Sequence, residues 1–179
     1  ATNWSLDLGN NFNISRTASL AGLFENLGKN AETFSLNLGI NFNAQNATNI
    51  SNMFSGIADK ATVWEIDFGN NLNMVKATTA DDMFTRVGYN QTEFNWDMGT
   101  KFSLPAASSI NRMFLNIGYS ANNFSLNLGD NINLKNATIT GPSAADMYGN
   151  GKSVFGGAGY SATNWSLDLG NNFNISRTA

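Results

Sequence analysis

Apolar residues alternate with polar ones in one short segment of every stretch of about 30 residues. The first such segment contains Trp4, Leu6 and Leu8 and ends at Gly9. Equivalent segments end at glycines that recur every 30 residues, at Gly39, Gly69, Gly99 and Gly129. This alternation, rich in aromatic and branched side chains, is typical of a strand with one buried face. The pattern therefore predicts one short strand before each glycine.

A second apolar spacing follows each glycine. In the second unit, Ile50, Met53, Phe54 and Ile57 stand at i, i+3, i+4 and i+7, which fits one face of an α-helix. The same spacing begins at Leu20, Ala80 and Ile110. Thr48, Thr78 and Ser108 stand at N-cap positions, and Gly28, Gly88 and Gly118 stand at C-cap positions. The sequence therefore predicts a short helix in each unit.

A single unit of this kind cannot bury both its strand face and its helix stripe. Stacked units can do so if their strands form a parallel ladder with a spacing of about 4.8 Å. We therefore expect residues 1–179 to form one α/β repeat solenoid. It would have five coils of about 30 residues, each with one short parallel strand and one short helix. Its open ends would expose strand edges and core.

A longer repeat lies over the shorter one. Residues 162–179 repeat residues 1–18 letter for letter at an offset of 161, whereas neighbouring 30-residue units have diverged. The 161-residue period equals five units of 30 plus an insertion of 11 at about residues 141–151. We interpret the chain as one period of an array plus the start of the next. A beginning at Ala1 instead of Met, and an end inside a motif, agree with that interpretation.

The insertion, GPSAADMYGNG, breaks the unit pattern once per period. One hypothesis is a simple loop that bulges from its coil. A sharper one is that the loop contacts a neighbouring fibre segment at fixed spacing, because nearby aromatic residues suit such contacts. The candidate contact residues are Pro142, Tyr148, Phe155 and Tyr160.

Asparagines recur two and four residues after the glycines. Stacked coils place such amides above one another, where each can bond its neighbour or the turn backbone. We predict a structural asparagine ladder, and binding of ice or sugar by the same column is the alternative. The ladder residues are Asn11, Asn41, Asn71 and Asn131, and Asn13, Asn43, Asn73 and Asn133.

Composition narrows the classes of function. With 42% hydrophobic residues the chain can bury a core, and no apolar run is long enough to span a membrane. A net charge of -3 with 13% charged residues offers no basic patch for nucleic acid. The chain has no cysteine and no histidine, so thiol, disulfide and zinc chemistry have no basis. We expect no cofactor.

Two further features have a functional and a simpler interpretation. N-x-S/T sequons are candidate N-glycosylation sites, although richness in Asn, Ser and Thr also creates them by chance. These candidates are Asn3, Asn13, Asn46, Asn49, Asn90, Asn123 and Asn136. Outward strand positions form an acidic and amide column, which could bind Ca²⁺ or, more simply, form a solvated face. That column contains Asp7, Asn37, Asp67, Asp97 and Asn127. A regular ribbon offers no cleft for a catalytic carboxylate pair, so we do not expect an enzyme.

Two stretches carry a resemblance to known repeats. The stretch Leu6-Asp7-Leu8-Gly9-Asn10-Asn11 is similar to the strand signature of leucine-rich repeats. The whole unit, above all ATNISNMFSGIA at 47–58, resembles the BspA-like leucine-rich-repeat surface proteins of bacteria. Met-Phe recurs at this helix position, at 53–54, 83–84 and 113–114. The resemblance implies an exported protein at the cell surface that takes part in adhesion or other extracellular interactions.

The sequence as a whole favours a structural repeat unit of an extracellular or cell-surface filament or stalk. Its partners would be copies of itself, end to end and through lateral fibre contacts, and possible glycans, but no nucleic acid. An adhesin-type solenoid that binds a host protein or glycan is the main alternative. An ice-binding solenoid is weaker, because it would need a regular threonine array and the outward strand residues are mostly Ser, Asp, Asn and Glu.

Overall fold

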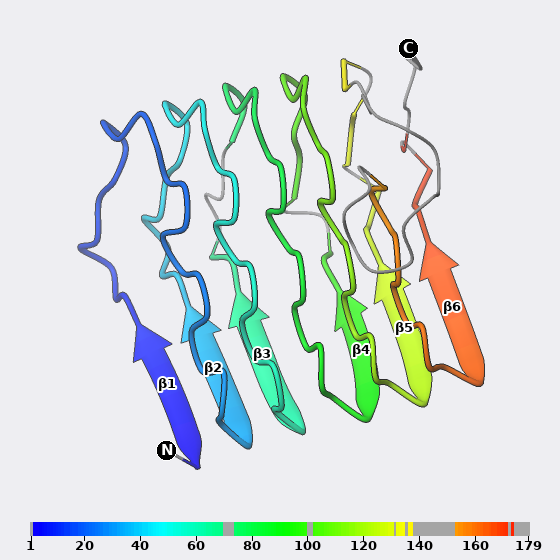
Figure 1. Ribbon diagram of the computed structural model, residues 1–179. Helices are drawn as coiled ribbons and strands as arrows, with labels where there is room; N and C mark the ends of the chain where they lie inside the picture. Colours follow the sequence, from blue (N-terminus) through cyan, green and yellow to red (C-terminus); the bar gives the residue numbers. More distant parts are fainter. Residues whose placement is uncertain are drawn as a thin grey trace.

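The chain forms a parallel β-solenoid whose turns are about 30 residues long. The computed structural model describes residues 2–69, 74–99, 102–130, 132–134, 136–137, 153–171 and 173. Its strands lie side by side in chain order, as Figure 1 shows. They are β1 (Asn3–Asp7), β2 (Thr33–Asn37), β3 (Val63–Asp67), β4 (Glu93–Asp97), β5 (Asn123–Asn127) and β6 (Asn164–Asp168). The predicted solenoid of parallel strands is therefore confirmed.

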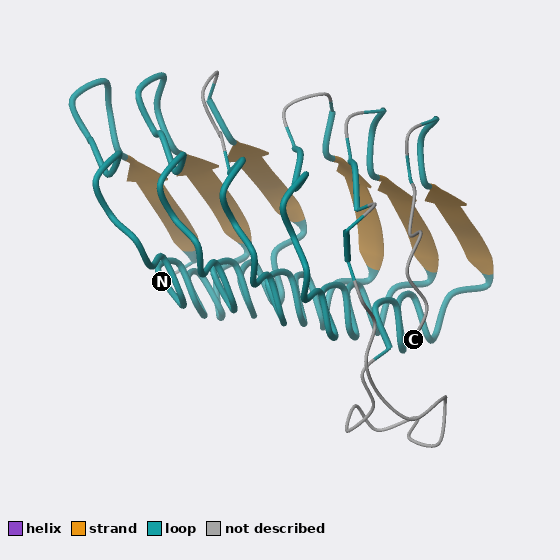
Figure 2. Ribbon diagram, turned by 90° about the horizontal axis from the view of Figure 1, so that it is seen from above, coloured by secondary structure: helices purple, strands orange, loops and turns teal. Residues whose placement is uncertain are grey.

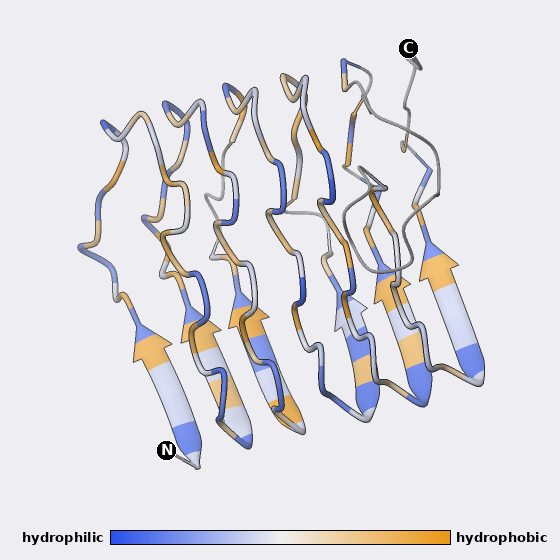
Figure 3. Ribbon diagram, in the orientation of Figure 1, coloured by the Kyte–Doolittle hydropathy of each residue, from blue (hydrophilic) through white to orange (hydrophobic). Residues whose placement is uncertain are grey.

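Strand pairing follows the repeat position by position. Trp4 of β1 is opposite Phe34 of β2, and Phe124 of β5 is opposite Trp165 of β6. The β5–β6 pair keeps this register although 41 residues separate its partners, so the insertion does not shift the stack. The last residue of each strand is consequently polar, as Figure 3 shows, whereas the first residue is apolar in β3, where it is Val63.

The predicted helices are wrong. None of the described residues is helical, and the segments expected to be helices are runs of turns. We call these segments the turn ribbons, which comprise residues 21–30, 51–60, 81–90, 111–120 and 156–161. They lie in a second row along the strands (Figure 2).

Hydrogen bonds explain why the ribbons are not helices. The amide of Phe24 donates to the carbonyl of Met53 in the next coil (2.9 Å), and Phe84 donates to Met113 (2.8 Å). In a helix these amides would instead bond four residues back along the same chain. The ribbons also need positive φ at fixed positions, such as 56° at Asn52 and 58° at Asp82. A helix is about 10 Å wide, whereas the strands repeat about every 4.8 Å, so stacked helices would require the solenoid to curve, and stacked ribbons do not.

The helical spacing nevertheless identified the buried side chains. Ile50, Met53, Phe54 and Ile57 are all 0% exposed. Turns stacked in register bury the same i, i+3, i+4 and i+7 positions that a helix would bury. The pattern therefore reported burial correctly and backbone geometry incorrectly.

The core lies between the strands and the ribbons and is organised in columns of rings. One phenylalanine in each of the first four ribbons, and Phe155 directly before the fifth, stack in order with ring centroids 5.2–5.6 Å apart. This phenylalanine column contains Phe24, Phe54, Phe84, Phe114 and Phe155. A second set of rings lies under the strands, where Phe124 stacks between Phe94 and Trp165. The columns join successive coils along the whole described stack.

The sheet is interrupted once, between β3 and β4. The strands form two three-stranded sheets, β1-β2-β3 and β4-β5-β6. No Cα atom of β3 lies within 8 Å of a Cα atom of β4. Trp96 in β4 occupies the position that Leu36 and Leu126 hold in β2 and β5, and its ring packs against Trp64, Phe68 and Phe84. This bulky ring is a physical reason for the wider spacing.

Charge repulsion also disfavours pairing between β3 and β4. Wherever the strands pair, the last strand position alternates between aspartate and asparagine, as in Asp7–Asn37 and Asp97–Asn127. At the unpaired step, Asp67 and Asp97 occupy equivalent positions. Like charges placed directly opposite one another destabilise a strand pair. The interruption therefore coincides with the one step between the described strands at which two carboxylates would face each other.

Candidate functional site

The outward strand face of the described residues carries mostly polar side chains, and several of them bond across coils. Val63, which is 67% exposed, is the apolar exception among the outward strand positions. Thr33 Oγ1 donates to Asn3 Oδ1 (2.8 Å), Asn123 Nδ2 to Glu93 Oε2 (2.7 Å) and Asn164 Nδ2 to Asn123 Oδ1 (2.7 Å). Hydrogen bonds between side chains therefore connect neighbouring strands on this face.

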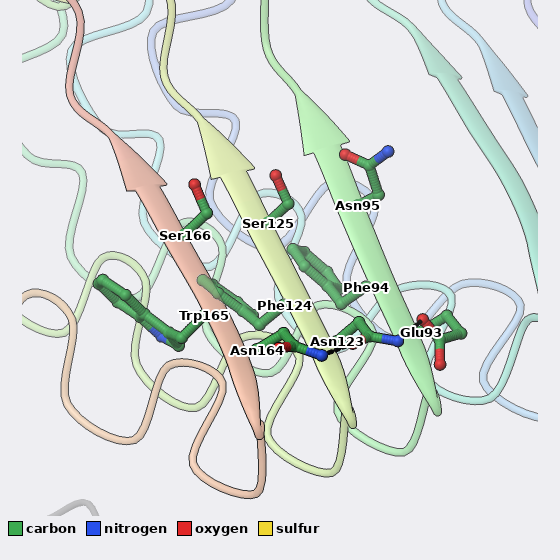
Figure 4. A pocket seen from close by; sticks show the side chains of 9 residues that line it. All are labelled: Glu93, Phe94, Asn95, Asn123, Phe124, Ser125, Asn164, Trp165 and Ser166. Carbon is green, nitrogen blue, oxygen red and sulfur yellow. Dashed lines mark hydrogen bonds between the residues drawn. The ribbon is translucent and has the colours of Figure 1, made fainter.

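A shallow hollow of about 400 Å³ lies over β4, β5 and β6. Figure 4 shows one polar row along Glu93, Asn123 and Asn164, and a second along Asn95, Ser125 and Ser166. The stacked rings of Phe94, Phe124 and Trp165 come from the positions between these rows. Phe94 and Phe124 are 1% and 2% exposed, so the apolar surface at this hollow comes mainly from the ring of Trp165, which is 51% exposed. An exposed aromatic ring beside amide and carboxylate groups can stack on a sugar ring.

The acidic and amide column has a structural role that the sequence analysis did not predict. Asp7 Oδ1 accepts the amide of Gly9 (2.7 Å), and Asn37 Oδ1 accepts the amide of Gly39 (2.8 Å). The same bond forms at Asp67, Asp97, Asn127 and Asp168. Each side chain thus forms an Asx turn that ends its strand. The recurring sequence Asp/Asn-x-Gly, in which the glycine follows two residues after the polar side chain, could have predicted these turns.

Metal binding has no support in this column. Within the described ranges, no group of three or more histidine, cysteine, aspartate or glutamate side chains is placed to hold a metal ion. The same residues include no helix long and apolar enough to cross a membrane.

The asparagine columns divide into two kinds of contact. Asn13 and Asn43 accept the amides of Ser15 and Gln45 (both 2.9 Å), so each ends a turn of its own coil. Asn41 instead donates from Nδ2 to the carbonyl of Asn10 in the preceding coil. Asn71, Asn73 and Asn131 lie outside the described residues, and Asn133 is half-buried. These bonds run from side chain to backbone, and the ladder of stacked amides stays a prediction.

A further set of hydrogen bonds joins neighbouring coils, and the sequence analysis did not predict it. Asn46 Nδ2 donates to the carbonyl of Ser15 (2.6 Å), and Asn136 Nδ2 donates to that of Pro105 (2.9 Å). Both asparagines belong to sequons. The side-chain nitrogen that a glycan would modify is therefore already the donor of a hydrogen bond to the neighbouring coil. Of the candidate glycosylation sites, Asn3, Asn13, Asn90, Asn123 and Asn136 are exposed, and Asn46 and Asn49 are partly buried. Glycosylation of these residues stays a prediction.

The candidate contact residues near the insertion lie in different environments. Pro142 and Tyr148 are outside the described residues. Phe155 stacks on Phe114 at 5.2 Å and belongs to the phenylalanine column. Tyr160 is 57% exposed and continues a surface column, since it stacks on Tyr119 at 4.8 Å. Of the two candidates that the structure describes, Tyr160 is exposed and Phe155 is half-buried.

A polar cluster joins the ribbons that follow β3 and β4. The Arg112 guanidinium donates from Nε (2.8 Å) and from Nη2 (2.6 Å) to the two carboxylate oxygens of Asp82. Thr85 Oγ1 also donates to the carbonyl of Arg112 (2.6 Å). The hydrogen bonds that Arg112 donates to the Asp82 carboxylate raise the pKa of Arg112. Asp81 accepts the Ser109 hydroxyl (2.6 Å), so two carboxylates of one ribbon bind the next.

No protein-family model, curated protein or solved structure matches this chain.

Proposed function

We propose that this chain is a structural repeat unit of an extracellular or cell-surface filament or stalk. The observation that carries the proposal is the phenylalanine column, which crosses the 41-residue step from Phe114 to Phe155 with the same stacking as the 30-residue steps. A stack that absorbs an insertion without a change of register is suited to indefinite repetition.

The contacts between coils give such a rod its stiffness. Ribbon amides bond the next coil at every second residue, as Leu20, Gly22, Phe24 and Asn26 do (2.8–2.9 Å). Stacked rings fill the core, and Asx turns fix the corners. Because these contacts need no disulfide or metal, the rod would keep its shape in a reducing or a chelating medium.

The resemblance of residues 47–58 to BspA-like repeats supports a place at the cell surface, and so do the exposed sequons. These two observations bear only on the location of the protein. The proposed mechanical role rests on the phenylalanine column.

Electron microscopy of the purified chain, together with its intact mass, tests the proposal. We expect unbranched rods and, in aligned samples, an axial reflection near 4.8 Å from the strand spacing. Discrete particles near 19.3 kDa under all conditions would contradict it.

An adhesin-type binder of host protein or glycan is the second candidate, and the hollow over β4–β6 favours it. Trp165 is 51% exposed beside that hollow, and aromatic faces with amide edges suit sugar rings. A glycan array would test it with Trp165→Ala, and Trp4→Ala is a matched control because both tryptophans stand in the sequence NWSLD. Binding that is lost only in Trp165→Ala would support the adhesin.

A further inference from the structure

Three tyrosines form a stacked column on the surface of the turn ribbons, which we call the tyrosine column. Tyr119 lies between Tyr89 and Tyr160, with ring centroids 4.9 and 4.8 Å apart and interplanar angles of 11° and 5°. Tyr89 and Tyr119 are partly buried, and Tyr160 is 57% exposed. Lys29 and Asp59 hold the equivalent positions in the first two ribbons, so the column begins at the third ribbon.

Backbone hydrogen bonds hold each pair of rings in place. The amide of Ser120 donates to the carbonyl of Tyr89, and the amide of Ser161 donates to that of Tyr119, both at 3.0 Å. The insertion at about 141–151 lies in the sequence between Tyr119 and Tyr160. Folding therefore keeps two phenol rings that are 41 residues apart in the sequence at stacking distance.

We propose that Tyr119 and Tyr160 form a site of oxidative cross-linking, at which a peroxidase joins two coils through a dityrosine bond. Because the two rings are stacked within one chain, their effective concentration is far above that of a second molecule, which favours coupling within the chain. The chain has no cysteine, so a disulfide cannot supply a covalent link between coils. The link would stiffen the proposed rod, but its formation does not depend on the proposed function.

The reaction consumes one molecule of hydrogen peroxide for each cross-link. Each phenol gives up one electron and one proton, which leaves a tyrosyl radical. The two radicals form a carbon–carbon bond between their Cε atoms, which are ortho to the oxygens. Each of these carbons then releases its hydrogen as a proton while the phenolic oxygen takes one up, so both rings become aromatic again. The two electrons and two protons removed reduce the peroxide to two molecules of water. The exposed ring of Tyr160 has room to tilt towards Tyr119 for this step.

Arg86 disfavours the other pair of the column. Its guanidinium carbon lies 3.8 Å from the centroid of the Tyr89 ring. A positive charge over an aromatic face is attracted to the neutral ring and opposes the removal of an electron from it. Tyr160 is also the most exposed ring of the column, and therefore the most accessible to an oxidant. Coupling of Tyr119 with Tyr160 is consequently favoured over coupling of Tyr119 with Tyr89.

Treatment of the full chain with a haem peroxidase and hydrogen peroxide, followed by trypsin and mass spectrometry, tests the site. Cleavage after lysine and arginine puts the four tyrosines on four different peptides, so each coupled pair has its own mass, less two hydrogen atoms. The peptides are 87–101 with Tyr89, 113–135 with Tyr119, 136–152 with Tyr148 and 153–177 with Tyr160. An equal mixture of nitrogen-15-labelled and unlabelled chains separates coupling within a chain from coupling between chains.

We expect the product of Tyr119 with Tyr160, formed within single chains, to exceed every other pair at least about fivefold. Tyr160→Phe keeps the stacked ring and abolishes this product, and the matched control Tyr89→Phe leaves it unchanged. Arg86→Asn raises the yield of Tyr89 with Tyr119 severalfold. In concentrated urea the preference disappears, because the stack is lost.

The same distribution of products in the native chain and in urea would overturn the site, and so would products that mainly join two chains. A main product of Tyr89 with Tyr119 would overturn the assignment to Tyr160. Each of these outcomes is independent of filament formation, so failure of the cross-link leaves the proposed function standing.

Discussion

The strand side and the ribbon side of the solenoid differ most at the step from the third coil to the fourth. On the strand side, β3 and β4 are unpaired and their Cα atoms are more than 8 Å apart. On the ribbon side, the amides of Asp82, Phe84 and Arg86 bond the next coil at 2.8–2.9 Å, and the Arg112–Asp82 pair spans the same step. The ribbons therefore hold coils together where the sheet does not.

This difference shows which contacts the fold requires. A parallel strand pair can be lost at one step, because ring stacking and ribbon bonds persist across it. We accordingly expect damage to the ribbon side to destabilise the fold more than damage to the strand side at this step.

The largest effect is expected from Phe84→Ala, which breaks the phenylalanine column on the ribbon side. Phe84 is fully buried and its ring contacts those of Phe54, Phe114 and Trp96. Loss of a buried phenylalanine costs about 3–5 kcal/mol of unfolding free energy. Urea denaturation measures it, with the end-coil variant Phe12→Ala as the control. Equal losses in the two variants would show that the column does not carry the stack.

Substitutions at two glycines compare a step where the strands pair, β4 to β5, with the step where they do not, β3 to β4. Both Gly99 and Gly129 have positive φ, 62° and 71°, so alanine costs about 1–2 kcal/mol at either position from backbone strain alone. At Gly129 a Cβ would also overlap the carbonyl of Gly99, whereas at Gly99 it would meet nothing within 4 Å. We expect Gly129→Ala to lower the unfolding free energy clearly more than Gly99→Ala does. Similar losses in thermal or urea melts would mean that β3 and β4 are closed in solution.

A smaller effect is expected from Arg112→Asn, which removes the guanidinium that binds Asp82. Asparagine suits the positive φ of this position, because Asn52 holds the equivalent place in the second ribbon. A half-exposed ion pair contributes about 1 kcal/mol or less. The control is Arg86→Asn, which also lies at positive φ and whose guanidinium lies over the Tyr89 ring instead. If both variants lose the same stability, the Arg112–Asp82 pair contributes nothing of its own.

The pH dependence of that pair follows from its pKa. The pKa of Arg112 is raised in the folded state, mainly by its hydrogen bonds to Asp82. A base with a raised pKa contributes stability that is complete below its unfolded pKa and is lost as pH rises through the folded pKa. Because the ordinary arginine pKa is above about 12, we expect the difference between wild type and Arg112→Asn to be constant from about pH 6 to pH 9. A marked change within that range would contradict the assignment.

The smallest net effect on stability is expected from Trp96→Leu/Asp97→Asn, which gives β4 the residues of a paired strand. The packing that the Trp96 ring loses against Trp64 and Phe84 is offset by the strand pairing that the variant allows. Leu126 and Asn127 stand at the equivalent places in β5, and an asparagine keeps the Asx turn. We expect the two sheets to join, with new amide protection in β3 and β4 measured by hydrogen exchange. Unchanged exchange there would show that neither the ring nor the charge keeps the strands apart.

The sequence was sufficient for the strands and the coil length, because a period of two before a recurrent glycine has few other structural solutions. It was insufficient for the ribbons, because stacked turns bury the same positions as a helix does. Gly22, Gly56 and Asn52 inside the expected helices were the missed signal, since all three residues adopt positive φ. A second missed signal was the width of a helix, which is about twice the spacing between strands.

The candidate site was predicted unevenly for a similar reason. Repetition alone revealed the asparagine columns, but the direction of each bond depends on the coil that faces it. Asn41 bonds the preceding coil, whereas Asn43, two residues later, ends its own turn. The interruption between β3 and β4 was equally hidden, because Trp96 and Asp97 become unusual only when the strands are aligned.

Residue-resolved amide exchange by NMR tests the central claim most directly at three equivalent positions. The amides of Leu38 and Met98 bond Asp67 and Asn127 across paired steps, both at 2.9 Å. Phe68 holds the same position at the step between β3 and β4, where the strands are unpaired. We predict that the Phe68 amide exchanges faster than those of Leu38 and Met98, on the order of tenfold or more, while the Phe84 ribbon amide stays protected. Equal protection at Leu38, Phe68 and Met98, or rapid exchange at Phe84, would contradict the account.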